Sequence, residues 1–276
     1  MIEWFSSLNF LKAFTMETHR ALNLSFRDEP LHRYTHILLS CLCAAYDDET
    51  ICEIVSSNPL LSKPIEIGKR FIDTMNRLSN RAVAISGASI LYAIKKAEDI
   101  LRTYEKKPFI VLCDCLSLPE YIYLYDRFSD RVDPNMMLYA INPGGMTKTF
   151  EHLAKAYLNI FHDEVTMTML AEGLKNQMKA AGSLVYRSMD KLIHKHGDLG
   201  FINLSDMAIN LYRVIEELTS KIGRILEKNC VLVISDHGYD VFFKDDKWYP
   251  FHRFSHEKNC LSTFSATLLI GDVLNG

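Results

Sequence analysis

The feature that most constrains this chain is an apolar run at residues 231–235, followed directly by Asp236, His237 and Gly238. Such a short run of aliphatic and β-branched residues is typical of a strand buried on both faces of a sheet. Open α/β sheets bind their ligands outside the carboxyl ends of their strands, so a carboxylate and an imidazole at this point are candidate site residues. A polar turn that merely ends the strand would have the same sequence, and the other strand ends must distinguish the two.

Beyond residue 108 the chain repeats this pattern. Apolar runs that predict further strands occur at 109–113, 136–141, 183–186 and 266–270. Helical periodicity separates them, starting at Pro119 and again over 150–158 and 206–227, and a turn at 244–246 predicts a hairpin over 240–248. Strands that alternate with helices favour right-handed βαβ units. We therefore expect an α/β fold with a mainly parallel sheet flanked by helices.

The region before residue 108 has a different character. It shows helical periodicity with few breakers, which predicts five or six helices. The pattern changes abruptly at Lys106, Lys107 and Pro108. We therefore predict two domains, an all-helical N-terminal domain over residues 1–107 and an α/β domain over residues 108–276.

Charge and cysteine content limit the class of protein. The formal net charge of −3 gives no global signal for nucleic-acid binding. The seven cysteines are an odd number and none shows the Cys-x-x-Cys spacing of a zinc knuckle, so they are predicted to be reduced thiols. The longest apolar run, at 37–46, is too short to span a bilayer, and the N-terminus lacks the basic start of a signal peptide. We expect a cytoplasmic protein with no membrane partner.

Polar residues that follow the predicted strands form the candidate site. The carboxyl ends of parallel strands meet at one edge of a sheet, so these side chains are expected to converge. Carboxylates and imidazoles are ligands for Zn²⁺, or for Mn²⁺ in a more oxygen-rich site. Two divalent ions about 3.5–4 Å apart can clamp the attacking and leaving oxygens of a phosphoryl displacement. The set consists of Asp114, Thr149, Asp190, His194, Asp236, His237 and either His252 or His256.

Thr149 is the candidate nucleophile. It lies between a glycine-containing loop at 142–145 and a predicted helix, whose N-terminal amide groups favour anions. An unassisted hydroxyl is a weak nucleophile at neutral pH, so this role requires an activating ion. Thr147 is the alternative nucleophile, and a helix N-cap is the alternative role for Thr149.

Several of these residues stand in motifs that resemble a known family. Residues 146–150, Met-Thr-Lys-Thr-Phe, resemble the nucleophile motif of nucleotide pyrophosphatase/phosphodiesterases, in the alkaline phosphatase superfamily, where the second threonine attacks phosphorus. Residues 235–238, Ser-Asp-His-Gly, are similar to the motif whose Asp and His hold one metal. Asp114 stands where the family has an early metal-binding Asp, but Cys115 follows it where the pyrophosphatase branch has Gly.

A third motif holds the other metal of that family. Asp190 and His194 resemble the ends of an Asp-x-x-Gly-His segment, although Ile193 replaces its Gly. The family's last metal ligand is a histidine ahead of the final strand; the distance to 266–270 favours His256, with His252 as the alternative. The short core and the Asp-x-Leu start of the site resemble PglZ-type domains most closely, and this resemblance covers residues 108–276.

The resemblance implies a metal-dependent phosphoesterase with two divalent ions, zinc before manganese. One ion would be held by Asp114, Thr149, Asp236 and His237, and the other by Asp190, His194 and His256. Thr149 would form a covalent intermediate with the phosphate group, which water then hydrolyses. The substrate implied is a phosphodiester, such as a nucleotide or oligonucleotide, with a phosphate monoester still open. The alternative is a regulatory PglZ-like module that turns nothing over and binds a protein partner through the helical domain, in a defence or signalling role.

Overall fold

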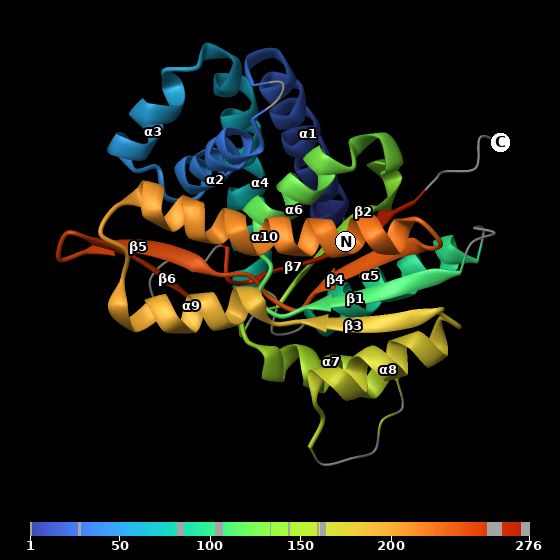
Figure 1. Ribbon diagram of the computed structural model, residues 1–276. Helices are drawn as coiled ribbons and strands as arrows, with labels where there is room; N and C mark the ends of the chain where they lie inside the picture. The colour runs from blue at the N-terminus through green and yellow to red at the C-terminus, as the bar shows by residue number, and fades with distance from the viewer. Residues whose placement is uncertain are drawn as a thin grey trace.

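The computed structural model describes residues 2–26, 29–81, 86–102, 107–132, 134–142, 144–158, 160, 164–252 and 261–271. A five-stranded sheet lies between two layers of helices, and a separate two-stranded hairpin projects from one end of it (Figure 1). This confirms the expected α/β class and the flanking helices. Within the described residues, no helix combines the length and the apolar character needed to cross a membrane.

The central sheet brings the carboxyl ends of four strands to one edge. Its order is β2-β7-β4-β1-β3, and β1 pairs in parallel with both β3 and β4. Strand β7 runs antiparallel to β4 and to β2, so β2 has the same direction as β1, β3 and β4. The strands are β1 (Pro108–Cys113), β2 (Met137–Ile141), β3 (Gly182–Tyr186), β4 (Cys230–Ser235) and β7 (Phe264–Ile270). The predicted mainly parallel sheet is confirmed, with β7 as the reversed strand.

The reversal of β7 follows from the connection before it. Strand β4 ends at the carboxyl edge, where β5 (Asp240–Lys244) and β6 (Lys247–Phe251) form the predicted hairpin. Asp245 and Asp246 adopt positive φ angles of 47° and 56°, as a two-residue type I′ turn requires. A chain that returns to the sheet from the edge it has just left, without a crossover, must run antiparallel.

Helices cover both faces of the sheet because the strand residues alternate between them. Val111 and Cys113 face one hydrophobic core, whereas Ile110 and Leu112 face the other. The first face is covered by α1 (Ile2–Ser25), α2 (Pro30–Tyr46), α4 (Ser62–Arg81), α6 (Leu118–Arg127) and α10 (Leu204–Leu226). The opposite face is covered by α5 (Ser86–Leu101), α7 (Thr147–Tyr157) and α8 (Met167–Gln177).

Shorter elements complete the chain. Helix α3 (Glu49–Ser56) follows α2, and α9 (Ser188–Leu199) lies beside the hairpin at the carboxyl edge (Figure 1). Within the described ranges, 3₁₀ turns span Pro59–Leu61, Ser129–Arg131 and Pro134–Met136.

The N-terminal helices pack into the same cores as the sheet. The Phe71 ring of α4 meets the Tyr139 ring of β2 edge-on, with centroids 5.2 Å apart, while α5 packs on the other face of that strand. Tyr34 of α2 and Tyr239 both donate to the buried carboxylate of Glu120, at 2.5 and 2.6 Å. The predicted division into two domains at residues 107 and 108 is therefore not confirmed.

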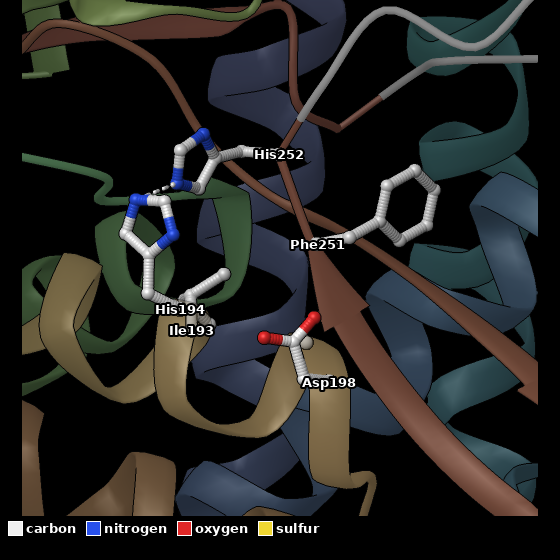
Figure 2. Close-up of a pocket in the computed structure, with 6 residues that line it drawn as sticks. Ile193, His194, Asp198, Phe251 and His252 are labelled. Atoms are coloured by element: carbon white, nitrogen blue, oxygen red, sulfur yellow. Dashed lines mark hydrogen bonds between the residues drawn. The ribbon is translucent and has the colours of Figure 1, made fainter.

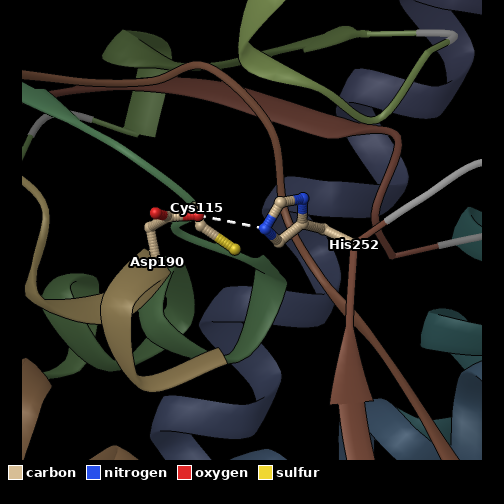
Figure 3. Close-up of side chains that lie close together, drawn as sticks. All are labelled: Cys115, Asp190 and His252. Atoms are coloured by element: carbon tan, nitrogen blue, oxygen red, sulfur yellow. Dashed lines mark ion pairs between the residues drawn. The ribbon is translucent and has the colours of Figure 1, made fainter. Parts of the chain in front are cut away.

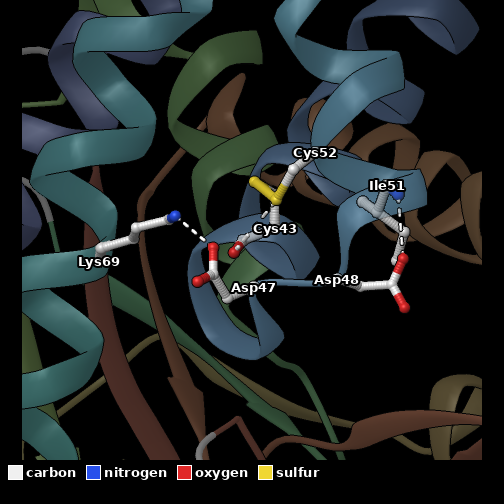
Figure 4. The surroundings of a disulfide bond; sticks show 6 residues. All are labelled: Cys43, Asp47, Asp48, Ile51, Cys52 and Lys69. Carbon is white, nitrogen blue, oxygen red and sulfur yellow. Dashed lines mark hydrogen bonds and ion pairs between the residues drawn. A yellow bond between two sulfur atoms is a disulfide. The ribbon is translucent and has the colours of Figure 1, made fainter.

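One cysteine prediction is wrong. Cys43 and Cys52 form a disulfide that joins α2 to α3 (Figure 4). After α2 ends, Asp47 adopts a left-handed φ of 53° and reverses the chain, and the Asp48 side chain then accepts from the Ile51 amide and begins α3. This turn brings two residues nine positions apart to a Cα separation of 5.1 Å. Among the described residues, Cys41, Cys113, Cys115 and Cys230 are buried and form no disulfide.

Candidate metal centre

Among the described residues, two groups of side chains that could hold metal ions adjoin at the carboxyl edge of the sheet. Asp114 follows β1, and Asp236 and His237 follow β4. Asp190 lies in the first turn of α9, which follows β3. The rings of His237 and His252 have centroids 4.8 Å apart, which places the two groups side by side. The predicted convergence of these strand ends is confirmed.

The first centre consists of Asp114, Asp236, His237 and Thr147. The ligand atoms of the first three all lie within 4.8 Å of one another. His237 Nε2 is 3.5 Å from Asp236 Oδ2 and 3.8 Å from Asp114 Oδ1. The Thr147 hydroxyl is 3.3 Å from both Asp114 Oδ1 and His237 Nε2. Three of these residues are almost wholly buried, with Asp114 7% exposed and Asp236 and His237 at 0%.

Main-chain hydrogen bonds orient the first centre. Asp236 Oδ1 accepts from the amides of Cys115 and His237, at 3.0 and 2.8 Å. Its other oxygen, Oδ2, is buried and accepts no hydrogen bond from the described residues. His237 Nδ1 lies 2.8 Å from the Gly238 carbonyl and donates to it, which leaves the Nε2 lone pair directed at the carboxylates. Acceptor atoms therefore face one another here, an arrangement that a cation would satisfy.

The electrostatics of the first centre favour a cation as well. Burial, followed by the neighbouring carboxylates, raises the pKa of Asp114 to about 7. Burial also raises the pKa of Asp236 to about 7, although the Cys115 and His237 amides and the Thr147 hydroxyl stabilise its charge. Burial lowers the pKa of His237 to about 4, so its imidazole is neutral at neutral pH. A divalent ion would stabilise both carboxylates in their charged form and bind a neutral imidazole.

The second centre consists of Asp190 and of two histidines, His194 and His252, whose rings lie beside each other in Figure 2. His252 follows the end of β6, and its Nε2 is 3.0 Å from Asp190 Oδ1 and 3.1 Å from His194 Nε2. His194 Nε2 is 3.3 Å from the same Asp190 oxygen. Burial acts to raise the pKa of Asp190, but the hydrogen bond from His252 and the charge of His194 hold it below its ordinary value.

Exposure differs among these three ligands. The side chain of His252 is 12% exposed and that of Asp190 20%, whereas His194 is 58% exposed. His194 and His252 line a cavity of about 220 Å³ together with Ile193, Gly197, Asp198 and Phe251. The predicted ligands Asp190 and His194 thus lie together, with the alternative His252. The preferred last ligand, His256, lies outside the described residues.

Thr147 and Thr149 occupy different positions on α7. Thr147 is the first residue of the helix and contacts the first centre. The Thr149 hydroxyl instead lies against the loop, since a Cβ on Gly144 would come within 2.3 Å of it. Residues two apart on a helix point about 200° apart, so the two hydroxyl groups face different directions. The residue that the structure brings to Asp114 is therefore the alternative nucleophile, Thr147.

The loop before α7 is tied to the end of β4. Asn142 Nδ2 donates to the carbonyls of Met146 and Asp236, both at 2.9 Å. Gly145 has a φ of 52°, which allows the turn between these contacts. The loop that leads to Thr147 is thus held by the segment after β4, which contains Asp236 and His237.

Arg187 and Cys115 were absent from the predicted site. Arg187 directly precedes α9, and its Nε lies 4.0 Å from Asp114 Oδ2. Its position after a predicted strand was the sequence signal that could have identified it. Cys115 follows Asp114 directly and is buried. No protein-family model matches the chain, and no curated protein matches its sequence.

Proposed function

We propose that this chain is a phosphoesterase that uses two divalent metal ions, on a core like those of PglZ-type domains and the alkaline phosphatase superfamily. The observation that carries the proposal is the set of buried acceptors in the first centre. Asp236 Oδ2 accepts no hydrogen bond from the described residues, and His237 directs the lone pair of Nε2 toward it. A hydroxyl group, that of Thr147, lies next to these ligands.

The donor sets fit two ions. Asp114, Asp236, His237 and the Thr147 hydroxyl would hold one, and Asp190, His194 and His252 the other. Mixed nitrogen and oxygen donors suit Zn²⁺, and Mn²⁺ is the second choice. When bound, such ions polarise phosphoryl oxygens and stabilise the charges of the attacking and leaving oxygens.

The chain's own residues then have distinct tasks. Thr147 Oγ would form a bond to phosphorus as the bond to the leaving alcohol breaks, with the hydroxyl proton passing to that alcohol. Water would then cleave the phosphothreonine and return a proton to Thr147. The first amides of α7 lie beside this hydroxyl and favour a phosphate anion. Arg187, 45% exposed at the rim, would contact the phosphate oxygens that point outward.

For the substrate we propose a phosphodiester of a nucleotide or oligonucleotide. The cavity next to the second centre is lined by Phe251, by Ile193 and by the polar His194 (Figure 2). A wall that is partly apolar suits a nucleoside better than it suits a small anion. The resemblance of residues 146–150 to a phosphodiesterase motif supports the same class.

The test is hydrolysis of bis-p-nitrophenyl phosphate by the zinc-loaded protein. Thr147→Ala is expected to lower the rate at least about 10³-fold, because it removes the nucleophile. Thr149→Ala, a matched change two residues away, should stay within a few-fold of the unmodified protein. A metal-loaded protein no faster than its Thr147→Ala variant, or unaffected by a chelator, would contradict the proposal.

An alternative function is partner binding without turnover. Large apolar side chains are exposed near the hairpin, with Leu199 58%, Ile202 76% and Phe243 54% exposed. Phe201 and Trp248 form a bridge that places these segments together, and the Phe243 ring lies 4.9 Å from that of Trp248. Such a patch suits a protein partner. Tight binding of two zinc ions with no hydrolysis of mono- or diesters would favour this alternative.

A further inference from the structure

Cys115 lies between the two centres with its main chain toward one and its side chain toward the other. Its amide donates to Asp236 Oδ1 at 3.0 Å, in the first centre. Its sulfur belongs to a group with an oxygen of Asp190 and a nitrogen of His252 in which all three atoms lie within 4.8 Å of one another (Figure 3). Cys115 lies in the segment after β1, Asp190 lies in α9, and His252 follows β6.

We propose that Cys115 is a thiolate ligand of the second metal ion. This inference rests on the proposed function, in which that ion is bound by Asp190, His194 and His252. It adds a soft sulfur donor to that set, so the second centre selects zinc over manganese or magnesium.

The backbone at Cys115 shows how the sulfur reaches this place. The residue has a φ of 67°, in the left-handed region that glycine adopts freely and residues with a Cβ disfavour. The left-handed conformation holds the amide toward Asp236 while the buried side chain lies beside Asp190 and His252. Glycine would allow the same turn without strain but would supply no sulfur.

The distances suit a single tetrahedral ion. Zinc bonds of about 2.0–2.3 Å to nitrogen, oxygen and sulfur place the ligand atoms roughly 3.3–3.7 Å apart. Asp190 Oδ1 and His252 Nε2 are 3.0 Å apart, and the sulfur is within 4.8 Å of this pair. Small side-chain rotations therefore bring all three onto one ion. Cys115, Asp190 and His252 form the inner ligands, and the exposed His194 stands on the side of the cavity.

Coordination changes one hydrogen bond of the thiol. In the structure Cys115 Sγ donates a long hydrogen bond of 3.6 Å to the Gly238 carbonyl. When the bond between metal and sulfur forms, the thiol proton passes to solvent. The Gly238 carbonyl still accepts from His237 Nδ1 at 2.8 Å, so no buried acceptor is left without a donor.

The experiment replaces zinc with cobalt and records the absorption spectrum. We expect two Co²⁺ per chain and a sulfur-to-cobalt charge-transfer band in the near ultraviolet. Cys115→Ala and Cys115→Gly should lose the band and lower zinc affinity at the second centre by at least about 10-fold, with a smaller effect on manganese. Cys41→Ala removes a different buried free thiol, which lies in α2, and should leave the charge-transfer band and the zinc affinity unchanged.

The outcomes separate this inference from the function on which it rests. Two Co²⁺ per chain with no charge-transfer band, or a band that persists in Cys115→Ala, overturns the sulfur ligand and leaves the two-metal proposal standing. Failure to bind Co²⁺ at all overturns both. Cys115→Gly guards against misfolding, because glycine accepts the backbone conformation at this position, and an unchanged circular dichroism spectrum would verify its fold.

Discussion

The two candidate centres adjoin, yet they are built in opposite ways. In the first, Asp114, Asp236 and His237 are buried, follow paired strands, and present acceptor atoms to one another. In the second, Asp190 and His252 satisfy each other through a 3.0 Å ion pair, and they come from a helix and the end of a hairpin strand. The first centre is therefore rigid and electrostatically incomplete, whereas the second is more exposed and partly neutralised.

The difference indicates how the centres should behave toward a metal. Side chains oriented by strand ends and amide hydrogen bonds lose little conformational entropy when an ion binds. The exposed His194 must be immobilised, and the pairing of Asp190 with His252 must be exchanged for bonds to the ion. We expect the first centre to bind more tightly and to release its ion last.

The largest expected effect comes from removing one charge from the first centre. Asp236→Asn should lower hydrolysis of bis-p-nitrophenyl phosphate at least about 10³-fold and eliminate tight binding of one ion, since several kcal/mol of charge stabilisation is lost. The matched change in the second centre is Asp190→Asn. Elemental analysis should find the first ion still bound in that variant. Loss of both ions there would mean that the centres are not independent.

The next effect separates two histidines of the second centre. His252→Ala should weaken binding of the second zinc ion roughly 10–100-fold, the range typical of disrupted metal-site interactions. His194→Ala should weaken it less, because that side chain is 58% exposed against 12% for His252. Competition with a chromophoric chelator measures both affinities. Equal losses would show that exposure does not rank these ligands.

A pH titration should show that carboxylate protons are released at the first centre and not at the second. With pKa values near 7, Asp114 and Asp236 carry protons in the metal-free protein that an ion must displace. Zinc affinity of the first centre should therefore fall about tenfold for each proton and each pH unit below 7. Asp190, with its pKa below the ordinary value, is already charged, so the second centre should respond less through its carboxylate. Isothermal titration calorimetry in buffers of different ionisation enthalpy measures the protons released.

The same carboxylates determine how stability depends on pH. Their folded-state pKa values lie above the ordinary value of 3.8, so their contribution is fully present below pH 4 and is lost as pH rises through 7. The midpoint temperature of thermal unfolding, measured on metal-free protein in a chelator, should therefore decrease as the pH rises from 5 to 8. Zinc-loaded protein should show a smaller fall, because the ion replaces the protons. Burial also raises the pKa of Glu120 to about 7. Glu120 should affect the pH dependence of stability equally in the chelated and in the zinc-loaded protein, and the Glu120→Gln variant controls for this effect.

The smallest expected effect is at the rim. Arg187→Ala should raise KM for the phosphodiester only about 2–5-fold, since an exposed ion pair is worth about 0.2–1 kcal/mol. Arg213→Ala, an exposed change on α10, is the matched control and should have no effect on KM. Steady-state kinetics with saturating zinc measures both. A loss of kcat rather than KM would assign Arg187 to the reaction itself.

The parallel strands and the polar residues at their ends could be predicted from sequence, because each signal is local. An apolar run followed by Asp236 and His237 indicates both a buried strand and its end. Because β1 and β4 run in the same direction, Asp114 lies at the same edge of the sheet. Helix α8 was not predicted, although its buried residues Met167, Leu170, Ala171 and Leu174 have the spacing of a helix.

Other features depended on contacts far apart in the sequence or on geometry that residue types do not fix. Whether Thr147 or Thr149 faces the carboxylates depends on the residue at which α7 begins. Sequence patterns locate the start of a helix only to within one or two residues. The pairing of Cys43 with Cys52 depends on the left-handed turn at Asp47. Packing of the N-terminal helices against β2 could not be read from their own periodicity, which shows that a face is apolar and not what covers it.

Strand β7 has a consequence for synthesis of the chain. It lies between β2 and β4, so β2 joins the sheet through a strand that ends at residue 270. Both hydrophobic cores contain residues of β7, and neither can close while the ribosome still holds that segment. While that segment is still held, β1, β3 and β4 can pair with one another, but β2 and one edge of β4 have no partner strand. We expect that chaperones which bind extended apolar segments are needed for high yields in cells.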